Sequence, residues 1–501
     1  MRRSIRPSAA LAVATLLLGS GCAVGPDFQR PAAPDVKGYT AEPTKEVTSS
    51  ADVTGGGAQT FVSGKDIPGQ WWELYRSPAL DGLVRQALHN NPDLQAAQAA
   101  LRQAQQLSAA QGGALFPAVD ASFAETRQKF AGAQFGQPAL SSIFSLANAT
   151  VGVSYALDVF GGTRRAIESA EAQAEMQRYQ LEASYLSLTA NVVTTAVQEA
   201  SLRAQVAATQ DIIQLETTQL DVVRRQFEVG GASKADVLAQ EATLAQVRTN
   251  LPPLQKMLAQ QRNLLTALVG RFPSQEIPEK FDLEKLELPL ELPLSLPSKL
   301  VEQRPDIRAA EAQLHQASAQ VGVAIANQLP SLTLNANWGS YANKVGDLFA
   351  GGTGAWSIGA GVTQPLFRGG ALMHERKAAE AALDQASAMY RSTVISAFRN
   401  VADTLRALQS DADALKEQLA AERAASDSLE LARQQYSAGA ISYLTLLNAE
   451  RTYEQTRIGL IQAQALRFAD TAALFQALGG GWWNRNDAAA PTQQEKVGLA
   501  R

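Results

Sequence analysis

The feature that most limits the possible folds is a stretch of 67 residues, 163–229, that contains neither glycine nor proline. Without these helix breakers the stretch is predicted to form one continuous helix, which at about 1.5 Å per residue would extend for roughly 100 Å. Few compact domains are large enough to enclose such a helix. Gly230 and Gly231 follow it directly and allow the chain to reverse into a second helix. The sequence therefore predicts a long helical hairpin over residues 163–270.

The chain contains the same series of motifs twice, at a nearly constant offset. The segment NPDLQAAQA at residues 91–99 returns as RPDIRAAEA at residues 304–312. Three further pairs follow in the same order: Phe116-Pro117 with Leu329-Pro330, Gly161-Gly162 with Gly369-Gly370, and Gly230 with Gly439. Four collinear matches indicate an internal duplication, so we expect two structural repeats, over residues 79–297 and 298–478. The second repeat should contain its own helical hairpin, over residues 371–478.

Each repeat also contains two segments in which apolar residues alternate with polar or small ones, the pattern of half-buried β-strands. Each segment is about ten residues long, enough to cross a bilayer when tilted. The four segments lie at about residues 119–128, 150–160, 331–341 and 355–367. The second strand of each repeat is followed by a glycine pair, Gly161-Gly162 or Gly369-Gly370. Because neither pair continues into a GxGxxG or phosphate-loop motif, we interpret both as strand-to-helix turns.

No stretch after residue 22 reaches the 18 or so consecutive apolar residues that a transmembrane helix requires. A chain of this kind can therefore cross a membrane only with strands. Four strands leave two open edges, whose unpaired backbone groups are too costly in lipid, and single-chain barrels begin at about eight strands. Several copies of the chain must then share one barrel.

The helix of the second repeat has an apolar stripe with unbroken 4-3 spacing. Its members are Val394, Phe398, Val401, Leu405, Leu408, Ala412, Leu415 and Leu419. This spacing is typical of a coiled-coil seam, and ordinary amphipathic packing is the alternative. The length of the helix and the duplication favour helical hairpins in a barrel or bundle.

The N-terminus has the features of an export signal. Residues 1–21 combine a basic start with a short apolar run that is too short to span a bilayer as a helix. They lead directly to Cys22, the single cysteine of the chain. This arrangement resembles the lipobox of bacterial lipoproteins, in which the cysteine is diacylated and becomes the new N-terminus, although Gly19 stands where leucine is usual. A buried cysteine in a longer leader is the alternative. Ala23 in place of aspartate implies, by resemblance, sorting to the outer membrane.

Composition excludes several classes of function. The chain has 44 basic and 48 acidic residues, so it lacks the clustered positive charge that nucleic-acid binding requires. One cysteine and three histidines (His89, His315 and His374) exclude a disulfide scaffold and a cysteine-rich metal site. None of the histidines begins an HExxH motif, and a GxSxG nucleophile motif is missing. We therefore expect no catalytic residues, no metal site and no nucleic-acid partner.

Several short segments resemble the outer-membrane efflux lipoproteins, the NodT-type branch of the TolC-like outer-membrane factor family. They are CAVGPDFQRP at 22–31, WWELY at 71–75, YALDVFG at 155–161, LPS at 296–298 before RPDI at 304–307, QPLF at 364–367 and YLTLLN at 443–448. The resemblance covers about residues 22–478, and together these motifs are highly specific.

The resemblance implies an α+β homotrimer. Each chain would give four strands to a 12-stranded transmembrane β-barrel, which a long periplasmic α-helical barrel would continue. The lipidated N-terminal segment, residues 22–78, would contribute to a mixed equatorial layer together with the linker after the first hairpin. Residues 479–501 would form a C-terminal tail.

The implied function is that of the exit duct of a tripartite efflux system. Such a duct passively conducts drugs, toxic compounds or metal ions, and its partners are a periplasmic membrane-fusion adaptor and a proton-driven inner-membrane pump of the RND type. It would lie in the outer membrane of a Gram-negative cell and extend into the periplasm, anchored by diacylglycerol and an N-acyl chain on Cys22, with no other cofactor. The duct of a type I protein-secretion system and a non-conducting lipoprotein scaffold are the alternatives. A scaffold has no use for four membrane-length strands.

The resemblance also places the periplasmic aperture at the helix tips, beside Gly230, Gly231 and Gly439. Residue by residue, the constriction should involve Leu444 and Asn448, with Thr445 and Asp236 nearby. A leucine ring narrows and dewets a pore, and polar rings hold the tips together by hydrogen bonds.

Three of these residues depart from the family pattern or have an alternative interpretation. The family commonly has aspartate at the position of Asn448, and an uncharged amide ring should be less cation-selective and less sensitive to pH. Leu444 has an alternative interpretation as ordinary helix packing, and Asp236 as a solvated acid in the first helical turn.

Overall fold

The computed structural model describes residues 23–43, 45–137 and 139–485. It combines long α-helices with a four-stranded antiparallel sheet, which confirms the predicted α+β fold. The predicted signal peptide, Cys22 and the part of the predicted tail from residue 486 onward lie outside the described residues.

The chain divides into two compact units, and each draws on both repeats. The first unit contains the described residues up to Pro31 together with Ala100–Gln177 and Ala309–Tyr390. The second contains Ala32–Ala99, Arg178–Arg308 and the described residues from Arg391 onward. The units therefore do not follow the boundaries of the repeats, because segments of the two copies fold together.

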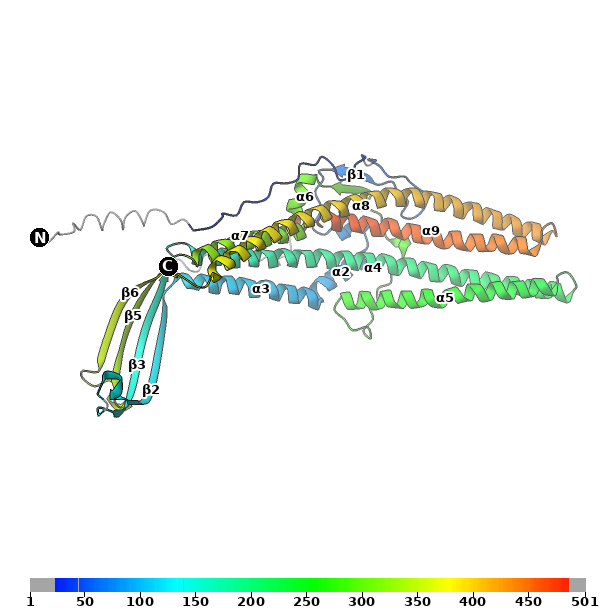
Figure 1. Cartoon of the computed structure of the whole chain (residues 1–501). Helices are drawn as coiled ribbons and strands as arrows, with labels where there is room; N and C mark the ends of the chain where they lie inside the picture. Colours follow the sequence, from blue (N-terminus) through cyan, green and yellow to red (C-terminus); the bar gives the residue numbers. More distant parts are fainter. Residues whose placement is uncertain (1–22, 44, 138, 486–501) are drawn as a thin grey trace. The chain divides into compact units, whose positions relative to one another are not determined.

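The first unit contains the sheet. Its strands are β2 (Ala118–Phe130), β3 (Ser142–Leu157), β5 (Ser331–Ala342) and β6 (Gly354–Thr363). They lie side by side in the order β2-β3-β5-β6, and each neighbouring pair is antiparallel (Figure 1). Each repeat contributes one hairpin, and the pairing of β3 with β5 joins the two. Within one chain, β2 and β6 are therefore the edges of the sheet.

The second strand begins earlier than predicted, at Ser142 rather than near residue 150. Residues 142–149 are predicted to belong to a connection, but they pair with the second half of β2, and Ser142 lies opposite Phe130. The neighbouring strand supplies backbone hydrogen bonds that no local pattern reveals. The β2-β3 hairpin is consequently longer than the alternation of the sequence indicates.

Two strands also end earlier than predicted. β3 ends at Leu157 rather than near residue 160, because the Asp158 carboxylate accepts hydrogen bonds from the backbone amides of Thr163 (2.8 Å) and Arg164 (3.0 Å). These bonds cap the following helix and turn the chain out of the sheet. β6 ends before residue 367 because Pro365 has no amide to donate to a strand ladder.

Four long helices form two hairpins (Figure 1). They are α4 (Gly162–Glu228) and α5 (Lys234–Leu268) in the first repeat, and α8 (Ala371–Ser437) and α9 (Tyr443–Ala477) in the second. α4 and α8 are each 67 residues long, and α5 and α9 are each 35. The two hairpins therefore match in length, as a duplication requires. None of the described helices is both long enough and apolar enough to cross a membrane.

The remaining elements are shorter. They are β1 (Thr60–Ser63), α2 (Pro78–Asn90), α3 (Pro92–Gly112), β4 (Glu291–Leu294), α6 (Pro297–Gln303) and α7 (Pro305–Ala326), with the 3-10 turns η1 (Trp71–Tyr75), η2 (Gly113–Leu115), η3 (Gly132–Phe135), η4 (Leu283–Lys285), η5 (Val345–Asp347) and η6 (Trp482–Asn484). In the second unit β1 pairs in parallel with β4. This pairing joins the N-terminal segment to the linker that follows the first hairpin.

Aromatic side chains anchor η1 to α9 in the second unit. Trp71 stacks on Phe475, with the ring centroids 5.2 Å apart. The Tyr75 hydroxyl donates a hydrogen bond to the backbone carbonyl of Phe468 (2.8 Å). All four side chains are buried, and burial of each contributes on the order of 2–3 kcal/mol. Trp71 is thus a packing residue of the interior.

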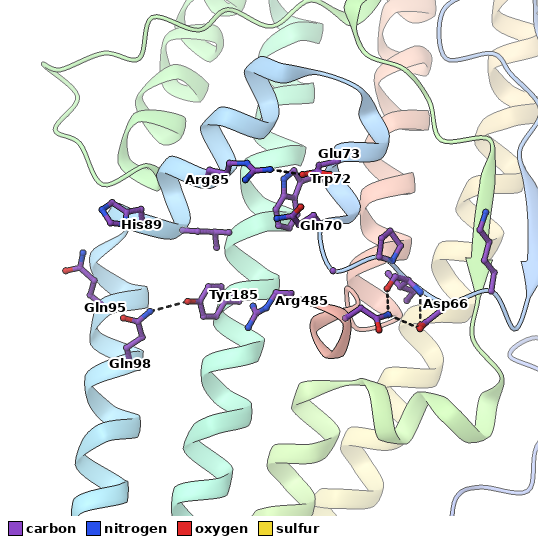
Figure 2. Close-up of a pocket in the computed structure, with 16 residues that line it drawn as sticks. Asp66, Gln70, Trp72, Glu73, Arg85, His89, Gln95, Gln98, Tyr185 and Arg485 are labelled. Atoms are coloured by element: carbon purple, nitrogen blue, oxygen red, sulfur yellow. Dashed lines mark hydrogen bonds and ion pairs between the residues drawn. The ribbon is translucent and has the colours of Figure 1, made fainter. Parts of the chain in front are cut away.

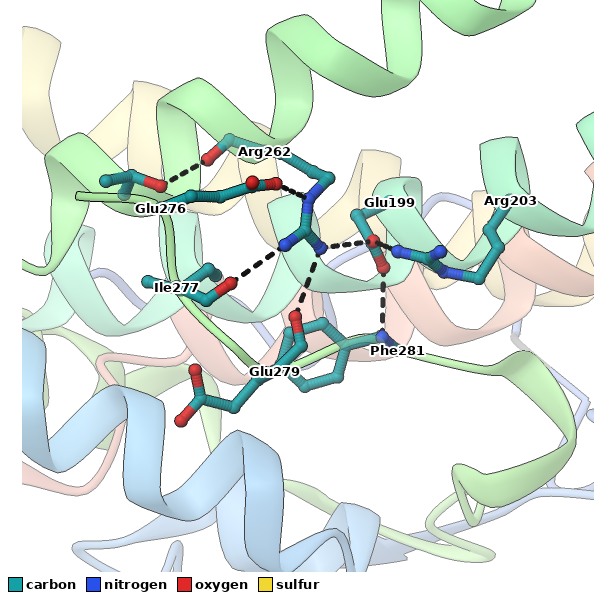
Figure 3. A network of polar contacts seen from close by, with 8 residues as sticks. Glu199, Arg203, Arg262, Glu276, Ile277, Glu279 and Phe281 are labelled. Carbon is teal, nitrogen blue, oxygen red and sulfur yellow. Dashed lines mark hydrogen bonds and ion pairs between the residues drawn. The ribbon is translucent and has the colours of Figure 1, made fainter. Parts of the chain in front are cut away.

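A charged network holds the linker after α5 against α4 (Figure 3). Glu199 on α4 is fully buried and accepts hydrogen bonds from Arg262 (3.1 Å), from the backbone amide of Phe281 (3.0 Å) and from Arg203. Arg262 on α5 also donates to the Ile277 carbonyl (2.8 Å). One carboxylate therefore connects two helices and the linker.

The predicted apolar stripe of α8 faces the interior of the second unit. From Val394 to Leu419 its members are buried, apart from Phe398, which is half-buried against Tyr39 at a centroid distance of 5.5 Å. The 4-3 spacing therefore marks a buried face of the helix.

Candidate functional site

The tip of the first hairpin is a glycine turn. The Gly230 amide donates to the Phe227 carbonyl (3.1 Å), and the Gly231 amide donates to the Gln226 carbonyl (2.7 Å). These two bonds form a Schellman motif, which needs a left-handed residue at its first position. Gly230 supplies it with a φ of +79°. The turn ends α4 within one residue.

The tip of the second hairpin has the same geometry. The Gly439 amide donates to the Tyr436 carbonyl and the Ala440 amide to the Gln435 carbonyl, both at 2.9 Å. Gly439 has a φ of +71°. Ala440 stands where the first tip has Gly231, so the turn requires glycine at its first position and accepts a side chain at its second.

Serine caps begin both return helices. Ser233 and Asp236 form a capping box at the start of α5, in which the Asp236 carboxylate accepts from the Ser233 amide (2.8 Å) and hydroxyl (2.7 Å). The Thr445 amide donates to the Ser442 hydroxyl (3.3 Å) at the start of α9. Asp236 is therefore more than a solvated first-turn acid, since its carboxylate satisfies the Ser233 amide, which would otherwise be unpaired.

The first turns of α9 have a buried face and an exposed face. Leu444, Thr445 and Asn448 are exposed on one side, and the side chain of Leu444 is 64% exposed. The opposite side packs into a core shared by all four long helices, whose buried members are Leu220, Val223, Val237, Leu244, Leu429, Ala432, Tyr443, Leu446 and Leu447. Leu444 lies outside this core, so packing within its own hairpin does not explain it. Its role in a gate stays a prediction.

A groove of about 310 Å³ runs between α8 and α9 at this tip. Thr445 and Asn448 line it together with Leu431 and Gln435 of α8. Two of the predicted aperture residues therefore also face the neighbouring helix of their own hairpin.

Beneath this surface lies a buried polar cluster that is not among the predicted sites. The Gln240 side-chain amide donates to the Glu216 carboxylate (2.6 Å) and to the Glu216 backbone carbonyl (3.0 Å). The Tyr443 hydroxyl in turn donates to the Gln240 side-chain oxygen. Glu450 lies beside Glu216, and its Oε1 is 3.8 Å from Arg433. The cluster draws on α4, α5, α8 and α9, and so connects the two hairpins.

The two carboxyl groups of this cluster are hard to ionise together. Burial, reinforced by the neighbouring Glu216 carboxyl, raises the pKa of Glu450 to about 8. Burial also raises the pKa of Glu216, although hydrogen bonds from Gln240 and Glu450 oppose this shift. Ionisation of both carboxyl groups is therefore unfavourable.

One signal in the sequence points to this cluster. Glu450 follows Tyr443 and Leu446 at the spacing of a single buried helix face, and Glu216 stands between Ile212 and Leu220 in the same way. A glutamate at an apolar position of a long helix indicates a buried, partnered carboxyl group. The spacing does not show which residue is the partner of this carboxyl group.

In the first unit, the segment after Cys22 is docked at the end of β3. The Val24 amide donates to the Phe160 carbonyl (3.0 Å), and Arg165 donates to the Val24 carbonyl (3.0 Å). Phe28 stacks on His315 with ring centroids 4.3 Å apart. His315 is therefore a packing and hydrogen-bonding residue. Among the described residues, no group of three or more His, Cys, Asp or Glu side chains is placed to hold a metal ion.

The glycine pairs after the strands lie at turns that lead into α4 and α8. Gly161, Gly369 and Gly370 have positive φ, at +76°, +59° and +84°. Gly162 begins α4, and a Cβ there would lie 2.8 Å from the Ala326 side chain. At Gly161 a Cβ would lie 2.5 Å from the backbone of Ala23, so the turn also makes room for the docked N-terminal segment.

A model of the outer membrane efflux protein family matches residues 83–271 and 296–480. The two matches cover most of the chain, and they lie in the first and second repeats. The chain belongs to the outer membrane efflux protein family.

Relatives extend over nearly the whole of this outer membrane efflux protein. The toluene efflux pump outer membrane protein TtgC of Pseudomonas putida is 32% identical, over 97% of this chain and 98% of its own length. The probable outer membrane lipoprotein SilC of Salmonella typhimurium is 28% identical, over 94% of this chain and 98% of its own. The structure of the outer-membrane channel OprN matches with a TM-score of 0.81 at 26% identity, covering 92% of this chain and 100% of that one.

These relationships confirm the predicted class and location. The chain is an outer-membrane component of an efflux system, and its family consists of transport proteins.

The second unit of the efflux protein also has a groove of about 1110 Å³ beside η1, α2 and α4 (Figure 2). Its charged side chains have partners within the chain. Arg485 contacts Glu182 at 2.6 Å and lies 4.2 Å above the Tyr185 ring, and Arg85 contacts Glu73 at 2.8 Å. These pairings favour a structural role for the groove wall over capture of a charged ligand.

Proposed function

We propose that three copies of this chain form a closed duct through which small molecules leave the cell, with a gate at the tips of the helical hairpins. The observation that carries the proposal is the sheet. Its four strands are 10 to 16 residues long, and its edges β2 and β6 have no partner among the described strands of the chain. Such edges are stable in a membrane only when further strands close the sheet.

The surface of the sheet supports a membrane setting. Large apolar side chains are exposed on it, among them Phe123, Trp338, Trp356 and Ile358. Trp338 and Trp356 lie directly opposite each other on β5 and β6. Tryptophan is typical of membrane–water interfaces, and exposed apolar strand faces are typical of contact with lipid. Three chains would supply twelve strands.

The partners follow from the same proposal. A passive duct has no energy source, so an inner-membrane pump of the proton-driven RND type would drive export through a periplasmic membrane-fusion adaptor. The cargo would be small molecules such as drugs, toxic compounds or metal ions.

The gate would consist of one Leu444 and one Asn448 from each chain. The exposed position of both residues at the start of α9 supports this role, because an exposed leucine at a pore axis narrows and dewets it. Thr445 lies on the same exposed face. Asp236 would act indirectly, through the cap that orders the start of α5.

Single-channel recording of the purified protein in planar bilayers tests the duct and the gate together. We expect a small, flickering conductance for the wild type and a severalfold larger one for Leu444→Ala combined with Asn448→Ala, because the apolar ring and its polar neighbour are both removed. Leu466→Ala is the matched control, since Leu466 is also exposed on α9 but lies far from the tip. It should conduct like the wild type.

Each other outcome has a distinct meaning. A wild type that conducts freely, with a double variant that matches it, would keep the duct but reject this gate. If neither protein conducts although both assemble as trimers, the duct is rejected in favour of a scaffold.

We also propose that Cys22 bears the lipid anchor. The docked segment supports it, because Ala23 lies against Gly161 at the end of β3. Gly25 adopts a φ of +96°, and a Cβ there would lie 2.5 Å from the backbone of Gly322, so the segment fits closely. The described segment directly after Cys22 is therefore held beside the sheet that we propose to cross the membrane.

Growth with labelled palmitate tests the anchor. The wild type should incorporate label, and its mature N-terminal peptide should begin at residue 22 with the mass of diacylglycerol plus one acyl chain. Cys22→Ser should incorporate none and should keep its leader, because the cysteine is the acylation and cleavage site. An unlabelled wild type, or a mature N-terminus elsewhere, would contradict the proposal.

A further inference from the structure

We propose that Glu216 and Glu450 share a proton that holds the two helical hairpins of each chain together at the tip, and that loss of this proton loosens the gate. The inference rests on the proposed function, because it concerns the same gate. It assigns a role to two buried residues that lie outside the predicted aperture.

The first argument is geometric. Glu216 belongs to α4 and Glu450 to α9, so their contact joins the first hairpin to the second. Both residues are buried, at 4% and 7% exposure, and Glu450 Oε2 has no hydrogen-bond partner among the described residues. A proton between the two carboxyl groups would satisfy both oxygens and remove one negative charge from the interior.

The second argument concerns the supports of the pair. Gln240 donates to Glu216 at 2.6 Å and accepts from Tyr443, so a second polar link between the hairpins runs through the same carboxylate. A movement of α9 away from α4 must break both links. The pair is therefore placed where it can oppose separation of the hairpins.

The third argument is the balance of charge around the pair. The charged and titratable groups that act on the pair are Arg433 from α8, and Tyr443, Arg451 and Glu454 from α9. Tyr436 from α8 and Asp236 from α5 act on Tyr443. Arg433 is 3.8 Å from Glu450, too far for a short ion pair, and Arg451 acts on both Glu216 and Glu454. Two arginines therefore face three carboxyl groups. Ionisation of both carboxyl groups would leave excess negative charge in a buried site.

The sign of the pH effect follows from the pKa values. In the closed tip the pKa of Glu450 is raised from 4.5 to about 8. Between these values the closed tip binds more protons than a separated one, so its stability falls as the pH rises. The stabilisation is complete below about pH 4.5 and is lost as the pH passes through about 8. Alkaline conditions should therefore open the gate.

Single-channel recording from pH 6 to pH 9 tests this, with the full-length protein. We expect the open probability of the wild type to rise above pH 7, by up to about tenfold per pH unit for each titrating carboxyl. Glu450→Gln keeps a hydrogen-bonding side chain but cannot ionise, so its open probability should stay low and independent of pH. Glu228→Gln, at the exposed end of α4, is the matched control and should follow the wild type.

Hydrogen exchange of the tip amides gives a second readout that does not require conduction. After correction for the intrinsic pH dependence of exchange, peptides around residues 216 and 450 should exchange faster above pH 8 in the wild type and not in Glu450→Gln. Equal pH dependence in the two proteins, by either method, overturns the inference. Absent currents in every variant, including Leu444→Ala with Asn448→Ala, would reject the duct, and the exchange result would then decide the proton-sharing pair by itself.

Discussion

Replacement of Arg467 by methionine should destabilise the second compact unit by about 3–5 kcal/mol, because several buried acceptors lose their donor and each costs about 1–3 kcal/mol. Arg467 on α9 is fully buried, and its guanidinium donates to the carbonyls of Leu408 (2.9 Å), Gly57 (3.0 Å) and Gly55 (3.4 Å). It also reaches the Thr48 hydroxyl (3.4 Å). Methionine fills a similar volume but donates nothing, so the loop around Gly55 and Gly57 keeps only weaker links to α9, such as the bond from Gln464 to the Thr54 carbonyl (3.2 Å).

The measurement is the midpoint of thermal unfolding in detergent, followed by circular dichroism, together with protease cleavage of the segment around residue 55. Both should change strongly in Arg467→Met. Arg423→Met is the matched control, because Arg423 contacts the same segment through Asp52, but at the surface (3.5 Å, with Asp52 fully exposed). The control should stay close to the wild type. Equal effects of the two substitutions would show that the buried guanidinium has no special role.

Replacement of Glu199 by leucine should lower the free energy of unfolding by about 3–5 kcal/mol, the range found when one partner of a buried ion pair is removed. The leucine leaves the buried Phe281 amide without an acceptor and takes the carboxylate from Arg262 and Arg203 (Figure 3). The linker after α5 should then detach from α4. Unfolding midpoints and faster amide exchange in residues 276–283 would measure this effect.

A second ion pair of Arg262 provides the control for the Glu199 substitution. Arg262 also pairs with Glu276, whose side chain is 57% exposed, whereas that of Glu199 is fully buried. Surface ion pairs are screened by water and contribute little. Glu276→Gln should therefore leave the unfolding midpoint near that of the wild type. A loss as large as that of Glu199→Leu would show that burial does not set the strength of this network.

The two repeats fold together rather than separately, as contacts in the sheet and in the tip core show. β3 of the first repeat pairs with β5 of the second, and the tip core takes residues from the hairpins of both. Neither repeat completes a compact unit alone. Substitutions at contacts between the copies should therefore affect the whole chain, whereas each hairpin turn depends only on its own residues.

The sequence by itself determined the features that depend on residues close together along the chain. The absence of helix breakers between residues 163 and 229 set the length of α4, and Gly230 and Gly439 set the turns because each needs a left-handed backbone. Motifs spread over both repeats were enough to indicate the family. The resemblance alone predicts Leu444 and Asn448 as aperture residues, and this stays a prediction.

Tertiary structure decided what depends on partners that are far away in sequence. β3 begins at Ser142 because β2 supplies backbone partners there, and no local alternation reports such pairing. Glu216 and Glu450 meet only because the two hairpins pack together, and desolvation then raises their pKa values. Hydrogen bonding across strands and the cost of burying charge are set by neighbours in space, which the order of residues alone does not specify.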